Sequence, residues 1–186
     1  MRSDDRVNGT LRIATVFVLT ACVWITASDA YAQSDPVVHP YQGVDDWAQL
    51  PDGRTWGAPA GVEMDPDQNS LWVFERCGVN SCSGSDLPAI LKFDSSGRLV
   101  QSFGGGMFIF PHGLHVDHDG NVYVTDGRGE GAIGHQIFKF SPRGELLLTL
   151  GQPGVAGEGP YTFNRPSDVA VAPNGDIFVA DGHSGQ

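Results

Sequence analysis

The sequence predicts an all-β protein built from repeated units, and three related segments are the reason. Residues 111–127 (PHGLHVDHDGNVYVTDG) are matched without a gap by residues 166–182 (PSDVAVAPNGDIFVADG). A looser copy, residues 60–76 (AGVEMDPDQNSLWVFER), keeps the same layout with one extra residue. A repeat of about 50 residues is typical of β-propeller blades. The alternative, a β-sandwich with evenly spaced strands, does not repeat a signature of this length.

Each copy reads as two short strands around a tight turn. Asp-Gly and Asn-Gly pairs in two of the copies supply the positive φ that a two-residue hairpin needs. Further strand-like runs follow the first two hairpins, joined by Ser-Ser-Gly or Pro-Arg-Gly turns, at residues 89–93, 99–103, 136–140 and 146–150. Four antiparallel strands per unit, repeated radially, make up a propeller blade.

The repeat sets the expected domain limits. We expect a partial propeller over residues 59–186, with blades at about 59–104 and 111–151 and an incomplete blade at 166–186. Residues 33–58 contain three prolines and no clear periodicity, so we interpret them as a lead-in that packs over the first blade. Propellers usually close with four to eight blades, and an open arc leaves unpaired strand edges. We therefore expect either a truncated gene product or completion by another chain, with self-association through the open blade edges.

The first 32 residues read as a secretory signal peptide. Three arginines precede an apolar run at residues 13–25, and the small-x-small motif at residues 30–32 is typical of a cleavage site. The run is too short to span a bilayer comfortably. The expected location is therefore secreted or periplasmic. Residues 19–22 (LTAC) also match a bacterial lipoprotein box, and the alternative is a lipid anchor on Cys22.

Charge and cysteine content exclude some functions. The formal net charge is -11 and the chain has only two lysines, which argues against nucleic acids and anionic membrane surfaces as partners. Cys77 and Cys82 have four residues between them in a Gly/Ser/Asn-rich loop. In an exported chain a local disulfide is the expected use, with two free thiols as the alternative. No histidine lies near them in the sequence, so we discount a metal site there.

Differences between the copies indicate where function lies, because the first strand of each propeller blade lines the central channel. His112 stands where the next copy has Ser167. We also align Arg76 of the first copy with Asp126 and Asp181 of the others. His112 and Arg76 are therefore the first candidates for a functional site.

Several short runs resemble one family of propellers. FPHGL (110–114), VTD (124–126) and RPSDVAV (165–171) are similar to the peptidyl-α-hydroxyglycine α-amidating lyase family, a six-bladed propeller built from NHL-type repeats. The resemblance extends from about Gly61 to His183 and covers the first half of the family's catalytic core. It implies about two and a half of six blades. The implied activity is cleavage of the N–C bond of a peptidyl-α-hydroxyglycine into a peptide amide and glyoxylate, a peptide or small-molecule substrate being the partner.

The resemblance also implies a site with zinc and calcium. His112 matches the first of three zinc-binding histidines, and the backbone carbonyls of Val62 and Leu114 match two contacts of a structural calcium. Arg76 matches an active-site arginine, and His183 stands where the family has an active-site tyrosine. A zinc ion held by three neutral imidazoles keeps an open position and polarises a bound hydroxyl as a Lewis acid. The other two histidines belong to later blades, so we expect the 186-residue chain to be inactive by itself.

Plainer interpretations and other functions stay open. His115 and His118 are interpreted as ordinary residues of a strand and its turn. The recurring aspartates Asp126 and Asp181 are interpreted as residues that fix the turns. One alternative function is a non-catalytic NHL propeller that binds proteins or glycans in the cell envelope, and another is a calcium-dependent hydrolase similar to gluconolactonase. Metal content separates these hypotheses.

Overall fold

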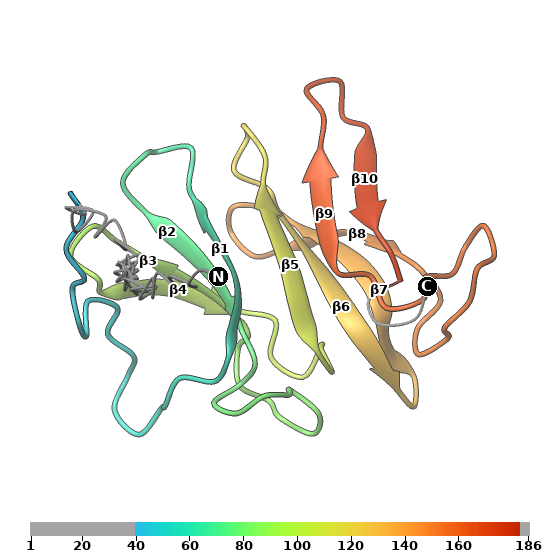
Figure 1. Cartoon of the computed structure of the whole chain (residues 1–186), viewed down its shortest axis with the longest axis horizontal. Coiled ribbons are helices and arrows are strands. Elements are labelled where there is room, and N and C mark those ends of the chain that lie inside the picture. Colours follow the sequence, from blue (N-terminus) through green and yellow to red (C-terminus); the bar gives the residue numbers. More distant parts are fainter. Residues whose placement is uncertain (1–39, 183–186) are drawn as a thin grey trace, which may run out of the picture. The chain divides into compact units, whose positions relative to one another are not determined.

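The computed structural model describes residues 40–182, and its regular elements are all β-strands, as the sequence predicts (Figure 1). The strands belong to one compact unit of the chain, residues 43–186. The strands are β1 (Pro59–Met64), β2 (Leu71–Glu75), β3 (Ile90–Phe93), β4 (Leu99–Phe103), β5 (Pro111–Val116), β6 (Val122–Glu130), β7 (Ile133–Phe140), β8 (Leu146–Leu150), β9 (Asp168–Val171) and β10 (Ile177–Ala180). The predicted signal peptide, Cys22 and His183 lie outside the described residues. Among residues 40–182, the structure contains no helix with the length and hydropathy of a membrane span.

The strands form two complete blades and one hairpin. The first sheet has the order β1-β2-β3-β4, the second has the order β5-β6-β7-β8, and β9 pairs with β10. All these pairs are antiparallel. Figure 1 shows β5 between β1 and β9, and both of these strands contact it. The first strands of successive blades are therefore neighbours, which is the radial arrangement of a β-propeller.

Alternating side chains let β6 contribute to two interfaces. Val122 and Val124 lie in the core cluster that β6 shares with the first blade, whereas Tyr123 lies in a second cluster with Val169 of the third hairpin. Successive side chains of a strand point to opposite faces of the sheet, so one strand can be buried on both sides. The second blade is thus packed between its two neighbours.

Aromatic rings fill the interface between the first two blades. Phe74 and Phe108 meet edge to face with their centroids 5.0 Å apart, and Phe108 meets Phe138 in the same way at 5.4 Å. Trp72 and Phe103 make a further edge contact at 5.7 Å. Edge-to-face pairs at these distances stabilise a core beyond their buried area. These rings belong to the core cluster that packs the first blade against the second.

The lead-in segment covers the other face of the first blade. Trp47, Ala48 and Leu50 pack against the buried cluster of Val73, Leu91 and Phe93. Gln49 forms an isolated parallel bridge with Arg98, just before β4. Residues 47–50 therefore bury the apolar face that the first blade turns away from the second.

Candidate functional site

The inner strands β1, β5 and β9 border a groove of about 380 Å³. It is lined by Ala60, Gly61, Val62, His112, Gly113, Leu114, Ser167 and Asp168. Two glycines allow the strands to come this close. A Cβ on Gly61 would lie 2.8 Å from Leu114 Cβ, and one on Gly113 would lie 2.6 Å from Asp168 Cα. The groove thus brings together three of the predicted metal-site residues, namely Val62, His112 and Leu114.

His112 is fixed by the neighbouring blade. Its Nδ1 lies 2.7 Å from the carbonyl oxygen of Ser167. A carbonyl oxygen only accepts, so Nδ1 carries the hydrogen and the lone pair of the neutral ring is on Nε2. Metal-binding histidines commonly use the same arrangement, in which the second ring nitrogen donates to a carbonyl or carboxylate. His112 is therefore chemically suited to be one metal ligand.

A bulge in β5 directs this part of the strand. The pairing with β6 shifts between Pro111 and Leu114, so Gly113 leaves the regular ladder. Its backbone N–H donates instead to the buried hydroxyl of Thr125 at 2.8 Å. A buried N–H without a partner is costly, and Thr125 removes that cost. The bulge thereby places His112 at the edge of the groove.

A carboxylate recurs in or directly after each second strand, and it corrects the alignment of Arg76. Pro59 pairs with Glu75 and Pro111 pairs with Asp126, so Glu75 occupies the position of Asp126 and Arg76 comes one residue later. The extra residue of the first copy lies in the turn of residues 65–70, which is longer than the equivalent turn of residues 117–121. The sequence alignment of Arg76 with Asp126 was therefore wrong by one position.

The three carboxylates accept equivalent hydrogen bonds from backbone N–H groups. Asp126 accepts hydrogen bonds from the N–H groups of Ile109 at 2.8 Å and Phe110 at 2.6 Å. In the same way, Glu75 accepts from Gly57 N–H at 3.0 Å, and Asp181 accepts from Asn164 N–H at 2.9 Å. Each carboxylate holds the segment that enters the first strand of its own blade. Burial raises the pKa of Asp126 to about 6, although its hydrogen bonds with backbone N–H groups favour the charged form.

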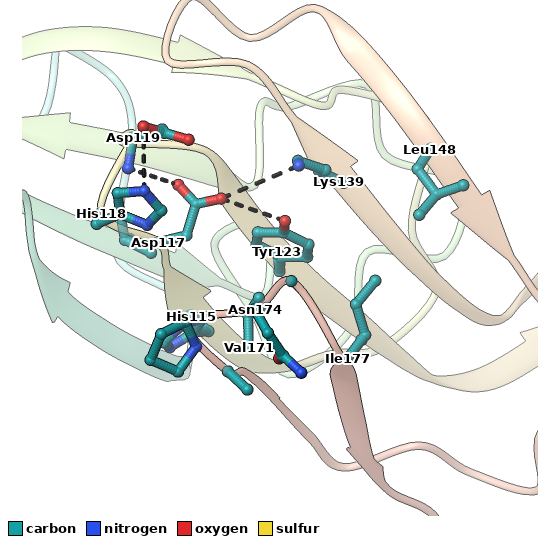
Figure 2. A pocket seen from close by; sticks show the side chains of 14 residues that line it. His115, Asp117, His118, Asp119, Tyr123, Lys139, Leu148, Val171, Asn174 and Ile177 are labelled. Carbon is teal, nitrogen blue, oxygen red and sulfur yellow. Dashed lines mark hydrogen bonds and ion pairs between the residues drawn. The ribbon is translucent and has the colours of Figure 1, made fainter.

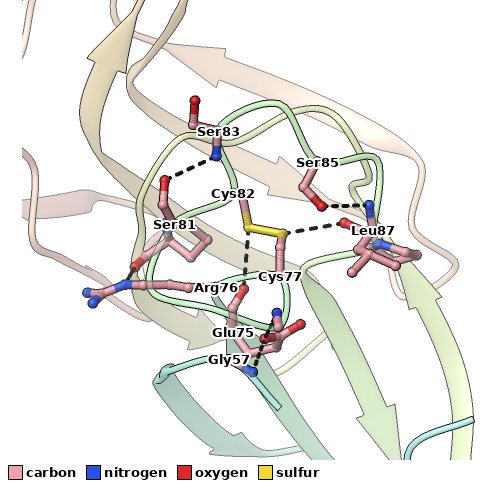
Figure 3. Close-up of a disulfide and its surroundings, with 12 residues drawn as sticks. Gly57, Glu75, Arg76, Cys77, Ser81, Cys82, Ser83, Ser85 and Leu87 are labelled. Atoms are coloured by element: carbon pink, nitrogen blue, oxygen red, sulfur yellow. Dashed lines mark hydrogen bonds between the residues drawn. A yellow bond between two sulfur atoms is a disulfide. The ribbon is translucent and has the colours of Figure 1, made fainter. Parts of the chain in front are cut away.

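Arg76 lies at the start of a loop closed by a disulfide (Figure 3). The predicted bridge between Cys77 and Cys82 is present, with a Cα separation of 5.1 Å. The loop is fastened to the segment before β5, since Cys82 N–H and Ser81 Oγ both donate to the carbonyl of Ile109. Arg76 itself donates from Nε to Pro111 O at 3.0 Å. Arg76 and His112 are therefore brought to the same end of β5.

A second arginine, which the sequence analysis did not single out, lies beside Arg76. The guanidinium carbon of Arg76 is 3.6 Å from the ring centroid of Phe110, and that of Arg128 is 3.9 Å from the same centroid. Burial, and secondarily the charge of Arg128, lowers the pKa of Arg76. The Phe110 ring is in turn 6.1 Å from that of His112. The sequence signal that could have identified Arg128 was the position of this arginine two residues after Asp126, in a chain with few cations.

His112 is not part of a group of three metal-binding side chains in the described part of the chain. Within residues 40–182, no three His, Cys, Asp or Glu side chains gather closely enough to hold a metal ion. His115 and His118, interpreted as ordinary, lie near carboxylates instead. His115 Nδ1 is 3.4 Å from Glu63, and His118 Nε2 is 3.4 Å from Asp119.

A larger cavity, of about 740 Å³, lies toward the other end of β5 and β9 (Figure 2). Several polar side chains that line it are hydrogen-bonded or ion-paired with one another. Asp117 accepts from Tyr123 Oη at 3.2 Å and lies 4.0 Å from Lys139 Nζ. Apolar residues such as Ile177 and Leu148 line the rest of it. This cavity is a space between the second blade and the third hairpin, and it contains none of the predicted site residues.

Comparison with known proteins agrees with the repeat architecture. The NHL repeat model matches residues 163–186, so the chain contains an NHL repeat. Its sequence is 42% identical over 88 residues to a probable peptidyl-α-hydroxyglycine α-amidating lyase of Caenorhabditis elegans, covering 46% of this chain and 23% of that one. It is 44% identical over 92 residues to peptidyl-α-hydroxyglycine α-amidating lyase 1 of Drosophila melanogaster, covering 48% of this chain and 16% of that one. The protein is thus related to the peptidyl-α-hydroxyglycine α-amidating lyases.

The chain spans less than a quarter of the length of these two relatives. Among solved structures, a virginiamycin B lyase from Staphylococcus aureus aligns with a TM-score of 0.46 at 18% identity. That alignment covers 70% of this chain and 36% of the other.

Proposed function

We propose that the inner strands of this propeller carry the first part of a metal-dependent lyase site of the amidating type. The reaction is cleavage of the N–C bond of a peptidyl-α-hydroxyglycine, which gives a peptide amide and glyoxylate. The observation that carries the proposal is the position of His112, on an inner strand with Nδ1 held by Ser167 O at 2.7 Å. The identity of 42% with a protein named as such a lyase supports the same function.

His112 is proposed as one of three zinc ligands, with the carbonyls of Val62 and Leu114 as calcium contacts. The tautomer of His112 fits this role, because neutral imidazole binds metal through the nitrogen that lacks a hydrogen. The remaining zinc histidines, by resemblance, belong to later blades. Zinc would supply Lewis-acid chemistry at the α-hydroxyl of the substrate. One imidazole alone does not bind zinc usefully, so we expect a monomer of these 186 residues to be inactive.

Arg76 is proposed to hold negative charge on the reacting group. The hydrogen bond from Nε to Pro111 O and the disulfide beside it fix the guanidinium, while Nη2 keeps its N–H donors for an anionic oxygen. A guanidinium fixed in advance needs little rearrangement when charge develops. We also propose that the protein is exported, which the disulfide and the predicted signal peptide support.

The proposal is tested by zinc binding and glyoxylate release with purified chains of residues 33–186. In samples where several chains assemble and can share one ion, we expect His112→Ala to weaken zinc binding by about tenfold or more, since removing a first ligand costs at least as much as removing its supporting hydrogen bond. His118→Ala, which changes an exposed histidine on a distant turn, is the matched control and should bind zinc as the wild type does.

Glyoxylate release from N-acetyl-α-hydroxyglycine is measured on the same samples, together with their solution mass. Turnover is expected only from an assembly of chains and should disappear in His112→Ala. Zinc binding that is equal in the wild type and in His112→Ala would refute the role of this residue.

A further inference from the structure

Two guanidinium groups share one phenyl ring at the edge of the groove. Arg76 follows β2, Arg128 lies in β6, and Phe110 precedes β5, so the cluster joins two blades. Both guanidinium carbons lie within 4 Å of the same ring centroid. A guanidinium over an aromatic ring is stabilised by the negative face of the ring. Phe110 therefore holds two positive charges close to each other.

No acidic residue of the described chain balances these charges. Four other cations, Arg54, Lys92, Arg98 and Lys139, each lie within 4.0 Å of a carboxylate oxygen. Within residues 40–182, neither Arg76 nor Arg128 has such a partner. Glu130, two residues after Arg128, accepts a hydrogen bond from Ser83 Oγ at 2.5 Å. In a chain of net charge -11, two adjacent arginines without a carboxylate are unusual enough to need an explanation.

The contacts of the two side chains leave donors for an external group. Arg76 uses Nε on Pro111 O and Nη1 on Asn80 Oδ1, and both acceptors are uncharged. Arg128 is exposed, and its guanidinium makes no hydrogen bond to another residue in the described part of the chain. Each guanidinium has five N–H donors in a planar fork that matches a carboxylate. An anion between or beside them would offset the repulsion between the two guanidinium groups.

We propose that Arg76 and Arg128, held on Phe110, form a binding site for a carboxylate and that Arg128 is a specificity-determining residue of the groove. The proposal rests on the proposed function for the identity of the ligand, since a peptidyl-α-hydroxyglycine ends in a carboxylate. The site lies next to His112, whose ring is 6.1 Å from that of Phe110. The two arginines would select substrates with a free C-terminal carboxylate over amides.

The test measures binding of N-acetylglycine and of the uncharged N-acetylglycinamide to the 33–186 chain by NMR titration or calorimetry. We expect N-acetylglycine to bind more tightly than the amide, and Arg128→Gln to weaken it by about tenfold, the effect of losing one charge-assisted hydrogen bond. Arg128→Lys keeps the positive charge but lacks the planar set of N–H donors, and it should give an intermediate affinity. Binding of the amide should be unchanged in all variants.

Arg143→Gln is the matched control, because Arg143 is an exposed arginine in the turn between β7 and β8. It removes the same charge at a distance and should leave binding unchanged. Equal affinity for N-acetylglycine in Arg128→Gln and Arg143→Gln would overturn the proposal, as would equal binding of the acid and the amide by the wild type. Zinc content and glyoxylate release are measured separately. Selective carboxylate binding without zinc binding at His112 would therefore refute the lyase site alone, and the reverse would refute the carboxylate site alone.

Discussion

Asp126 is a buried acid on whose charged form burial and hydrogen bonding have opposite effects. It is fully buried within the second strand of its blade, and it holds the N–H groups of Ile109 and Phe110 next to the candidate site. Removal from water disfavours the carboxylate, whereas the two N–H donors favour it. The first effect is larger, and the pKa is raised to about 6.

This raised pKa predicts a pH dependence of stability. Between about pH 4 and pH 6 the unfolded chain has lost the Asp126 proton while the folded chain still holds it, so the folded state binds more protons and loses stability as the pH rises. A shift of about two pKa units corresponds to about 3 kcal/mol, which is lost across this range and stays lost above it. Urea unfolding at a series of pH values measures the change.

Asp126→Asn provides the control for that measurement. The amide does not titrate, so the variant should be less stable at pH 4 but should lack this fall between pH 4 and pH 6. Wild type and Asp126→Asn curves that run parallel across the range would contradict the assignment to Asp126.

The inner strands approach each other more closely than side chains normally allow. β5 meets β9 at Gly113, where a Cβ would be 2.6 Å from Asp168 Cα and 2.8 Å from Ser167 O. Because these are backbone atoms, the obstruction cannot be relieved by turning a side chain. The same close approach lets Ser167 O reach His112 Nδ1. The packing of this pair of strands and the geometry of the candidate ligand therefore depend on the same glycine.

Gly113→Ala is predicted to separate β5 from β9. Overpacking of this kind costs about 1–3 kcal/mol, and we expect a loss of stability in that range in urea unfolding. Gly43→Ala, at a position with nothing within 4 Å of the added Cβ, should change stability by less than about 0.5 kcal/mol. The hydrogen bond of His112 should also weaken in Gly113→Ala, which is seen as a shift of the His112 Nδ1 resonance in NMR. A variant as stable as Gly43→Ala would show that the strands tolerate a wider spacing.

At the scale of the whole molecule, the two ends of the arc of blades expose apolar surface. Val62 and Met64 of β1 are 63% and 52% exposed, and Phe178 of β10 is 61% exposed. Within residues 40–182, β10 pairs only with β9, so its other edge presents unpaired backbone groups. In a propeller these two surfaces are the ones that neighbouring blades cover. Exposed edges with apolar residues favour pairing with another chain.

We predict that the 33–186 chain self-associates through these surfaces. Sedimentation velocity should show a mass that rises with concentration, and Phe178→Glu should shift the distribution toward monomer by placing a charge on the exposed face of β10. Val44→Glu changes a residue of the lead-in that is 72% exposed and should leave the association unchanged. A monodisperse monomer with a cooperative melt would contradict the prediction.

Local patterns in the sequence were sufficient to predict the strands. The turn residues and the alternation of side chains lie within each hairpin, so the four-stranded blades and the NHL-type repeat could be read without knowledge of distant contacts. The short loop with Cys77 and Cys82 was equally local, and the disulfide is present. The alignment of Arg76 failed because an extra residue in the turn of residues 65–70 shifts the register, and only strand pairing reveals where such a residue is accommodated.

Local strand and turn patterns, and the comparison of the repeated copies, were enough to predict the fold class and to select His112 and Arg76. Only the tertiary structure placed Ser167 O against His112 and brought Arg128 to Phe110 beside Arg76. Both contacts depend on how the blades pack. That packing is decided by side chains and glycines far apart in the sequence, whose close approach no local pattern encodes.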